Sequence, residues 1–249
     1  ISMIVSAVWV LYYFFSCKSL IKIHAENLKL RLKVVIQICA IGSAPFAMQI
    51  VASLLNIILN NSLMYYSGDI AISAMGVVNS ISMLMLMPIF GINQGVQPII
   101  GYNYGAKNFD RVKEALKLAI LFATSIVTFG FLLVQLFPQQ LISLFNREDR
   151  ELIELGARAM RIFLLVFPIV GFQIVGANYF QAVGKPKKAM FLSLSRQLII
   201  FVPAMLILPR LFNLGLNGIF IAGPLSDLIS CILTAVLLFV ELKNLNEKQ

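Results

Sequence analysis

Two charged side chains lie deep inside apolar stretches of this sequence. Arg196 occurs in "SLSRQLIIFVPAMLILP" (193–209) and Asp227 in "GLNGIFIAGPLSDLIS" (215–230). Charged groups in such segments are costly and commonly serve a proton or ion pathway. Asp227 is the one acidic residue deep in an apolar segment. It is therefore the candidate for an ion-coupling site.

Arg196 is a possible partner for Asp227, and pairing would lower the cost of both charges. Side chains lean toward the N-terminus of their own helix. If the two stretches are successive antiparallel helices, these side chains lean in opposite directions, which argues against direct pairing. In the alternative arrangement Arg196 extends to the membrane surface. A third interpretation makes Asp227 a packing residue held by Ser226, Ser230 and Arg196.

Uncharged polar residues recur at helical spacing in four apolar segments. Steps of three, four or seven residues place them on one face of a helix. The predicted substrate cavity is lined by Gln49, Ser53, Asn56, Asn60, Gln94, Gln97, Asn178 and Gln181, and the same faces include Gly101, Tyr104, Gly171, Gly223, Ser230 and Thr234. The alternative is that these groups only join helices by hydrogen bonds, worth about 0.6 kcal/mol each. Four polar faces favour a shared cavity.

The sequence lacks the motifs of catalysis and of cofactor binding. It has no phosphate-binding loop, no HExxH or GxSxG motif, and a single histidine. The three cysteines have no metal-ligand spacing. We therefore expect neither an enzyme nor a bound cofactor or metal.

The composition identifies the solvent of this chain as lipid. Of its 249 residues 59% are hydrophobic and only 12% are charged, and the mean hydropathy is +0.89. Soluble domains contain about 25% charged residues. Membrane lipids are thus predicted partners. The positive net charge is explained by loops at a membrane surface rather than by nucleic acid.

Apolar runs predict an all-α, polytopic membrane protein, because backbone groups in lipid must be paired within a helix. The first run covers 1–17, and six more cover 41–64, 71–102, 115–137, 161–182, 189–208 and 216–238. Prolines within or at the ends of these runs can bend them. They are Pro45, Pro88, Pro98, Pro168, Pro203 and Pro224.

Lys and Arg gather in alternate connections, namely 16–33, 103–117, 184–188 and the C-terminal tail. Cytoplasmic loops carry this excess of positive charge. We therefore predict that these connections and the C-terminus are cytoplasmic. The first run starts apolar and is short for a span, so we expect the chain to be a piece of a longer protein.

Four segments resemble the C-terminal half of multidrug and toxic compound extrusion (MATE) transporters. Besides the two stretches quoted above, they are "GINQGVQPIIGYNYGAKNFDRVKEALK" (91–117) and "GFQIVGANYFQAVGKPKKAM" (171–190). The resemblance implies a partial transmembrane helix 6 (1–17), a cytoplasmic inter-lobe linker (18–40), a six-helix lobe of helices 7–12 (41–240) and a cytoplasmic tail (241–249). The N-terminal lobe would be missing.

By this resemblance the chain is part of an antiporter in a bacterial cytoplasmic membrane. It would export cationic or amphipathic drug-like molecules in exchange for H⁺ or Na⁺. The NorM-like branch carries acidic residues in helices 7 and 10, whereas the corresponding segments here hold only amides such as Gln49, Asn56, Gln173 and Asn178. The chain is more similar to the DinF-like and MepA-like branches. In DinF-like members a coupling acid lies in the N-terminal lobe.

Two other functions stay open from the sequence. One is a lipid-linked oligosaccharide flippase of the related MurJ-like group, which builds a more basic cavity than the single Arg196 offers. The other is a non-transporting fragment of a truncated gene.

Overall fold

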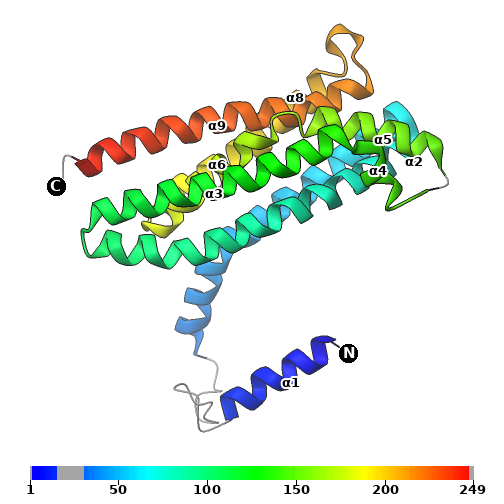
Figure 1. Cartoon of the computed structure of the whole chain (residues 1–249). Coiled ribbons are helices and arrows are strands. Elements are labelled where there is room, and N and C mark those ends of the chain that lie inside the picture. The colour runs from blue at the N-terminus through cyan, green and yellow to red at the C-terminus, as the bar shows by residue number, and fades with distance from the viewer. Residues whose placement is uncertain (1, 16–30, 148, 247–249) are drawn as a thin grey trace. The chain divides into compact units, whose positions relative to one another are not determined.

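A computed structural model describes residues 2–15, 31–147 and 149–246 (Figure 1). Every regular element in these ranges is a helix, as the sequence predicts. The chain divides into two units, residues 1–49 and 50–249. The first unit holds helix α1 (Ser2–Phe15) and the beginning of helix α2 (Leu32–Gly105). Helix α2 thus begins inside the segment expected as a linker, of which residues 18–30 lie outside the described residues.

Within the second unit, α2 reverses direction at Gly68. Gly68 has φ 69° and ψ −156°, a conformation that favours glycine because a Cβ atom would clash there. Residues 50–67 and 69–105 are therefore the two legs of a hairpin, and they correspond to the second-unit part of the expected span 41–64 and to the expected span 71–102. Gly68 is the only described residue of α2 whose backbone angles are not helical, so the helix continues through Pro88 and Pro98.

The segment from 138 to 182 differs from the sequence prediction. The expected runs end at 137 and resume at 161, but the connection between them forms helix α4 (Pro138–Ser143) and most of helix α5 (Arg150–Phe163). Asp149 caps α5 by accepting a hydrogen bond from the Leu152 amide at 3.0 Å. Helix α6 (Phe167–Ala182) follows at an angle of 54° to α5. The expected run 161–182 is therefore divided between the end of α5 and α6 by a bend at 164–166. Pro168 lies in the first turn of α6, a position that proline favours at the start of a helix.

The C-terminal part consists of one continuous helix with a π-helical stretch inside it and of a second, longer helix. Helix α7 (Pro186–Leu194) continues into a π-helix, η2 (Ser195–Phe201), and then into α8 (Val202–Ile207). The short 3₁₀-helix η3 (Leu211–Asn213) leads to α9 (Leu216–Asn246). π-Helical turns are rare and often lie at functional sites. Here the π-helix contains Arg196.

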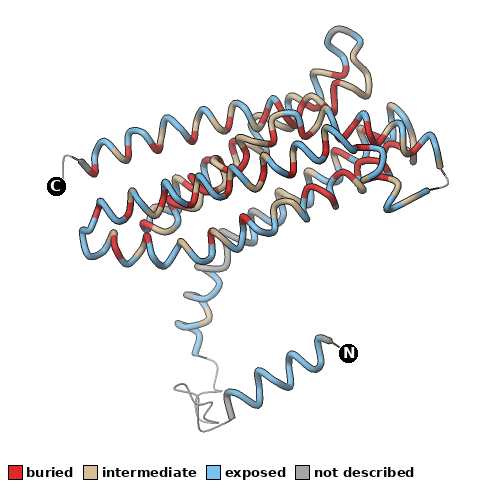
Figure 2. Tube along the Cα trace, viewed as in Figure 1, coloured by how far each residue is buried: buried red, intermediate tan, exposed pale blue. Residues whose placement is uncertain are grey.

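The remaining helix, α3 (Phe109–Leu136), packs on α6. A Cβ atom on Gly171 would lie 3.0 Å from the backbone of Ala123 and Thr124, so the two helices approach too closely for any larger residue. Gly171, expected on a cavity face, therefore contacts α3. The facing sides of the helices are buried, whereas the outer sides are exposed (Figure 2). These outer sides carry large apolar residues such as Phe122, Phe129 and Phe239.

Four described helical stretches are long and apolar enough to cross a membrane, or five if α5 and α6 count as one bent span. One of the four, 49–105, includes the reversal at Gly68. The apolar outer surface and these lengths together confirm the polytopic membrane fold.

Candidate functional site

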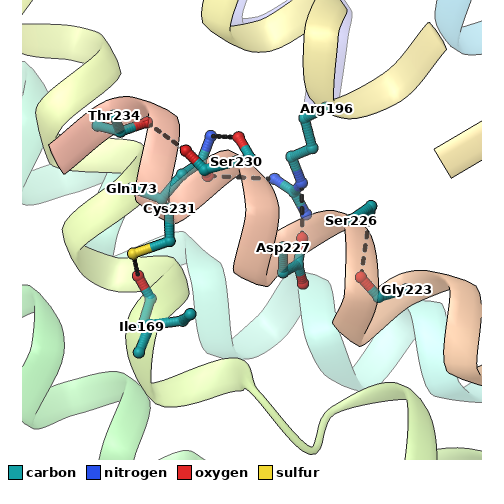
Figure 3. A network of polar contacts seen from close by, with 9 residues as sticks. All are labelled: Ile169, Gln173, Arg196, Gly223, Ser226, Asp227, Ser230, Cys231 and Thr234. Atoms are coloured by element: carbon teal, nitrogen blue, oxygen red, sulfur yellow. Dashed lines mark hydrogen bonds and ion pairs between the residues drawn. The ribbon is translucent and has the colours of Figure 1, made fainter. Parts of the chain in front are cut away.

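Arg196 and Asp227 form a direct ion pair between η2 and α9. The Arg196 Nε atom lies 2.7 Å from Asp227 Oδ1 (Figure 3). The expectation from side-chain direction was wrong. The arginine side chain is long, and the π-helical turn changes the direction in which residues of this segment project. The pair is largely enclosed, since the side chain of Asp227 is 12% exposed and that of Arg196 is 32% exposed.

Gln173 of α6 connects this ion pair to the middle of α9. The Arg196 Nη1 atom donates to Gln173 Oε1 at 3.4 Å, and Gln173 Nε2 donates to Ser230 Oγ at 3.3 Å. Both distances are long for hydrogen bonds. Ser226 does not hold Asp227, because its hydroxyl donates to the Gly223 carbonyl. The network in Figure 3 thus spans three elements, α6, η2 and α9.

A first cavity, the amide cavity, lies between α6, η2, α7 and the second leg of α2. Its volume is about 360 Å³. Four predicted residues line it, Gln94, Gln97, Asn178 and Gln181. Its other polar lining residues are Asn93, Gln173, Ser193, Arg196 and Gln197. Asn178 Nδ2 donates to the Asn93 carbonyl at 3.4 Å and so joins α6 to α2.

A second cavity, the Asp227 cavity, is lined by both members of the ion pair. Its volume is about 500 Å³, and both legs of the α2 hairpin contribute to its wall. Arg196 and Gln197 line both cavities, whereas Asp227 lines only this one. The wall also includes the predicted residue Asn56 and many apolar side chains. Arg196 therefore contributes to an amide-rich cavity and to a more apolar one, and its acidic partner contributes only to the second.

Two predicted residues of the second unit are not brought into either cavity. Ser53 and Asn60 are exposed on the first leg of the α2 hairpin. Gln49 is exposed in the first unit of the chain. A role for the predicted residues in substrate binding stays a prediction.

The sequence reasoning missed a second ionic site, at the end of α9. Glu241 is 1% exposed, and its carboxylate pairs with Lys185 and, at 2.9 Å, with Lys188. Lys188 also lies 5.4 Å from the centre of the Phe180 ring. Burial alone would lower the pKa of Lys185, but the hydrogen bond and the charge of Glu241 raise it above its ordinary value. We call these three residues the Glu241 clamp.

Comparison with known proteins places these features in a family. The family model MatE matches residues 44–206. The multidrug export protein MepA of Staphylococcus aureus (strain MSSA476) is 24% identical over 244 residues, which cover 98% of this chain and 52% of that protein. The chain therefore spans about half the length of the curated relatives that it matches.

Solved structures match at similar coverage. The structure of the MATE multidrug transporter DinF-BH is 41% identical, with a TM-score of 0.77 over 94% of this chain and 52% of that one. The inward-facing conformation of a multidrug resistance MATE family transporter is 21% identical, with a TM-score of 0.87 over 99% of this chain and 57% of that one. The second likeness concerns the fold alone.

Proposed function

The chain belongs to the MatE family, and on that premise we propose that it is the C-terminal lobe of a cation-coupled multidrug antiporter. The complete protein would export cationic or amphipathic molecules across a bacterial cytoplasmic membrane in exchange for H⁺ or Na⁺. The missing N-terminal lobe would be its main partner. The names of the similar proteins support multidrug export, and the polar cavities within apolar helices support a transport path.

The observation that carries the proposal is the position of the Arg196–Asp227 pair. It lies within apolar helices, and its arginine lines two cavities whereas its aspartate lines one of them. A carboxylate in such a place can release its arginine partner and bind a proton or a cation instead. The arginine-paired state and the proton- or cation-bound state would leave different charges at the cavity walls. This is the property that an ion-coupled transporter requires, since the driving ion must bias two states of the protein.

Antiport is tested by following the export of a cationic dye, ethidium, from cells that express the full-length gene product. We expect export to stop when a protonophore collapses the H⁺ gradient and an Na⁺ ionophore collapses the Na⁺ gradient. Each ionophore alone identifies the coupling ion. Export that survives the loss of both gradients would refute ion coupling, and cells carrying the empty vector provide the baseline.

The flippase alternative is less favoured. A pyrophosphate headgroup requires several cationic side chains, and Arg196 is the one cation among the residues that line the two cavities.

A further inference from the structure

The amide cavity and the Asp227 cavity differ in the charged side chains that line them. The lining of the amide cavity includes one charged side chain, Arg196, and no carboxylate. The Asp227 cavity contains the same arginine together with its acidic partner. The positive member of the ion pair, Arg196, therefore lines both cavities, whereas the negative member, Asp227, lines only the Asp227 cavity. In a low-dielectric interior such a difference is felt strongly by any ligand beside the ion pair.

The guanidinium of Arg196 has more hydrogen-bond donors than its two partners, Asp227 and Gln173, use. Its Nε atom contacts Asp227 and one N–H of Nη1 is directed to Gln173. Within the described part of the chain, its other N–H groups have no hydrogen-bond partner. A guanidinium can hold a carboxylate or a phosphate with two parallel hydrogen bonds, so one arginine can serve Asp227 and a second anion at once.

The amides around Arg196 can complete such a site. Gln94, Gln97, Gln181 and Gln197 line the cavity, and their side-chain amides form no hydrogen bond with the other described residues. Each amide carries an NH₂ group that donates to an anion and a carbonyl that accepts from a cation. Amides alone therefore do not select between an anionic and a cationic ligand. The nearby arginine does.

We propose that the amide cavity binds an anionic group, a carboxylate or a phosphate, which is held by the free face of Arg196 and by the surrounding amides. The proposal refines the function proposed above, because it predicts that this lobe favours amphipathic or zwitterionic molecules. The anionic group would occupy the amide cavity, and the cationic or apolar part would lie in the Asp227 cavity. Binding does not require transport, so the two proposals can fail separately.

The test uses two dyes that differ in one carboxylate, rhodamine B and its ethyl ester. Their affinities for the full-length protein in phosphatidylcholine nanodiscs are measured by fluorescence anisotropy. We expect Arg196→Gln to weaken rhodamine B binding about tenfold or more, as for the loss of a charge-assisted hydrogen bond, and to change ester binding less than about threefold. Equal losses for both dyes, or no loss for either, would overturn the proposal.

Two further variants guard against a general loss of structure. Arg196→Gln combined with Asp227→Asn removes both charges, so no unpaired carboxylate remains, and it should lose the preference for rhodamine B in the same way. Arg210→Gln alters an exposed arginine outside both cavities and should retain that preference. A double variant that still prefers rhodamine B would contradict the assignment to Arg196.

The anion could belong to a solute or to a lipid headgroup, and the lipid of the nanodisc distinguishes them. If phosphatidylglycerol weakens rhodamine B binding to the wild type but not to Arg196→Gln, the site accepts lipid headgroups. If the lipid has no effect on the wild type, the site is selective for solutes. A lipid effect of equal size in both proteins would place the anion elsewhere and overturn the proposal.

Discussion

Helix α9 carries two enclosed carboxylates, Asp227 and Glu241. We infer that Asp227 can change its ionic partner, whereas Glu241 stays paired and stabilises the fold. They lie about four helical turns apart on a similar face. Both pair with cations from the chain between Lys185 and Arg196. Glu241 has two lysine partners, whereas Asp227 has one arginine.

Glu241 is also more fully enclosed by the protein than Asp227 is. Glu241 is 1% exposed, and it lines neither of the two central cavities. Asp227 forms part of a cavity wall, and its arginine also reaches a second cavity. A carboxylate with two cations loses little if one moves away. A carboxylate with one cation next to an open space can change partners, so we assign the dynamic role to Asp227.

The largest effect is expected from removing both cations of the Glu241 clamp. Lys185→Met with Lys188→Met leaves a buried carboxylate without a partner, which typically costs about 3–5 kcal/mol of folding free energy. The two lysine side chains are 34% and 39% exposed, so we expect the lower end of that range. The midpoint of thermal unfolding in detergent measures the loss.

Two controls isolate the charge. Lys187→Met changes a neighbouring exposed lysine for which the described residues provide no ion pair, and it should be neutral. Adding Glu241→Gln to the double lysine variant should restore most of the stability, because no buried charge then remains. A double lysine variant as stable as the wild type would show that the clamp contributes nothing.

A matched pair of substitutions on α9 tests the functional side of the contrast. Asp227→Asn and Glu241→Gln remove the same charge and preserve the shape of the side chain. We expect Asp227→Asn to reduce gradient-driven dye export roughly tenfold, a loss of about 1.4 kcal/mol, with the protein level unchanged. Glu241→Gln should leave export within about twofold. Wild-type export by Asp227→Asn would remove this residue from the mechanism.

The sequence anticipated the parts of this structure that depend on local pattern. Apolar runs identified the helices, because lipid forces the backbone to pair within each one. Helical spacing predicted that Gln94 and Gln97 share a face with each other, as do Asn178 and Gln181, and all four line the amide cavity. The reversal between the legs of α2 was expected near Gly68, where the polar connection lies.

The parts that depend on three-dimensional placement were missed. The rule for side-chain direction assumes a regular α-helix, and the π-helical turn at Ser195–Phe201 departs from it. The Glu241 clamp was overlooked because Glu241 follows the apolar run and reads as part of a solvated tail. The lysines in the 184–188 connection were already explained by the positive charge of cytoplasmic loops. Nothing in the local sequence therefore indicated that they share an acidic partner. The polar 138–161 segment was read as a loop, although its charged residues form one face of α5.

A smaller effect is expected when the clamp loses a single lysine. In Lys185→Met or Lys188→Met the other lysine still neutralises Glu241. Half-exposed ion pairs contribute roughly 0–1 kcal/mol, so each single variant should lower the unfolding midpoint only slightly. The sum of the two single effects should then fall well short of the double variant, because the second lysine removed leaves the carboxylate alone. Additive single effects would show that each lysine acts independently.

The smallest effect concerns the pH dependence of the stability that the Glu241 clamp contributes. Burial lowers the pKa of Lys185, but the hydrogen bonds and charges of Glu241 and Tyr104 together raise that pKa above its ordinary value in the folded protein. A raised lysine pKa contributes stability that is complete below the unfolded value of about 10.5 and is lost as the pH rises through the higher folded value. The contribution of the clamp should therefore be constant at neutral pH and decline only in strong alkali. The difference between the unfolding midpoints of the wild type and Lys185→Met should shrink there, and a difference that already shrinks below about pH 9 would contradict this assignment.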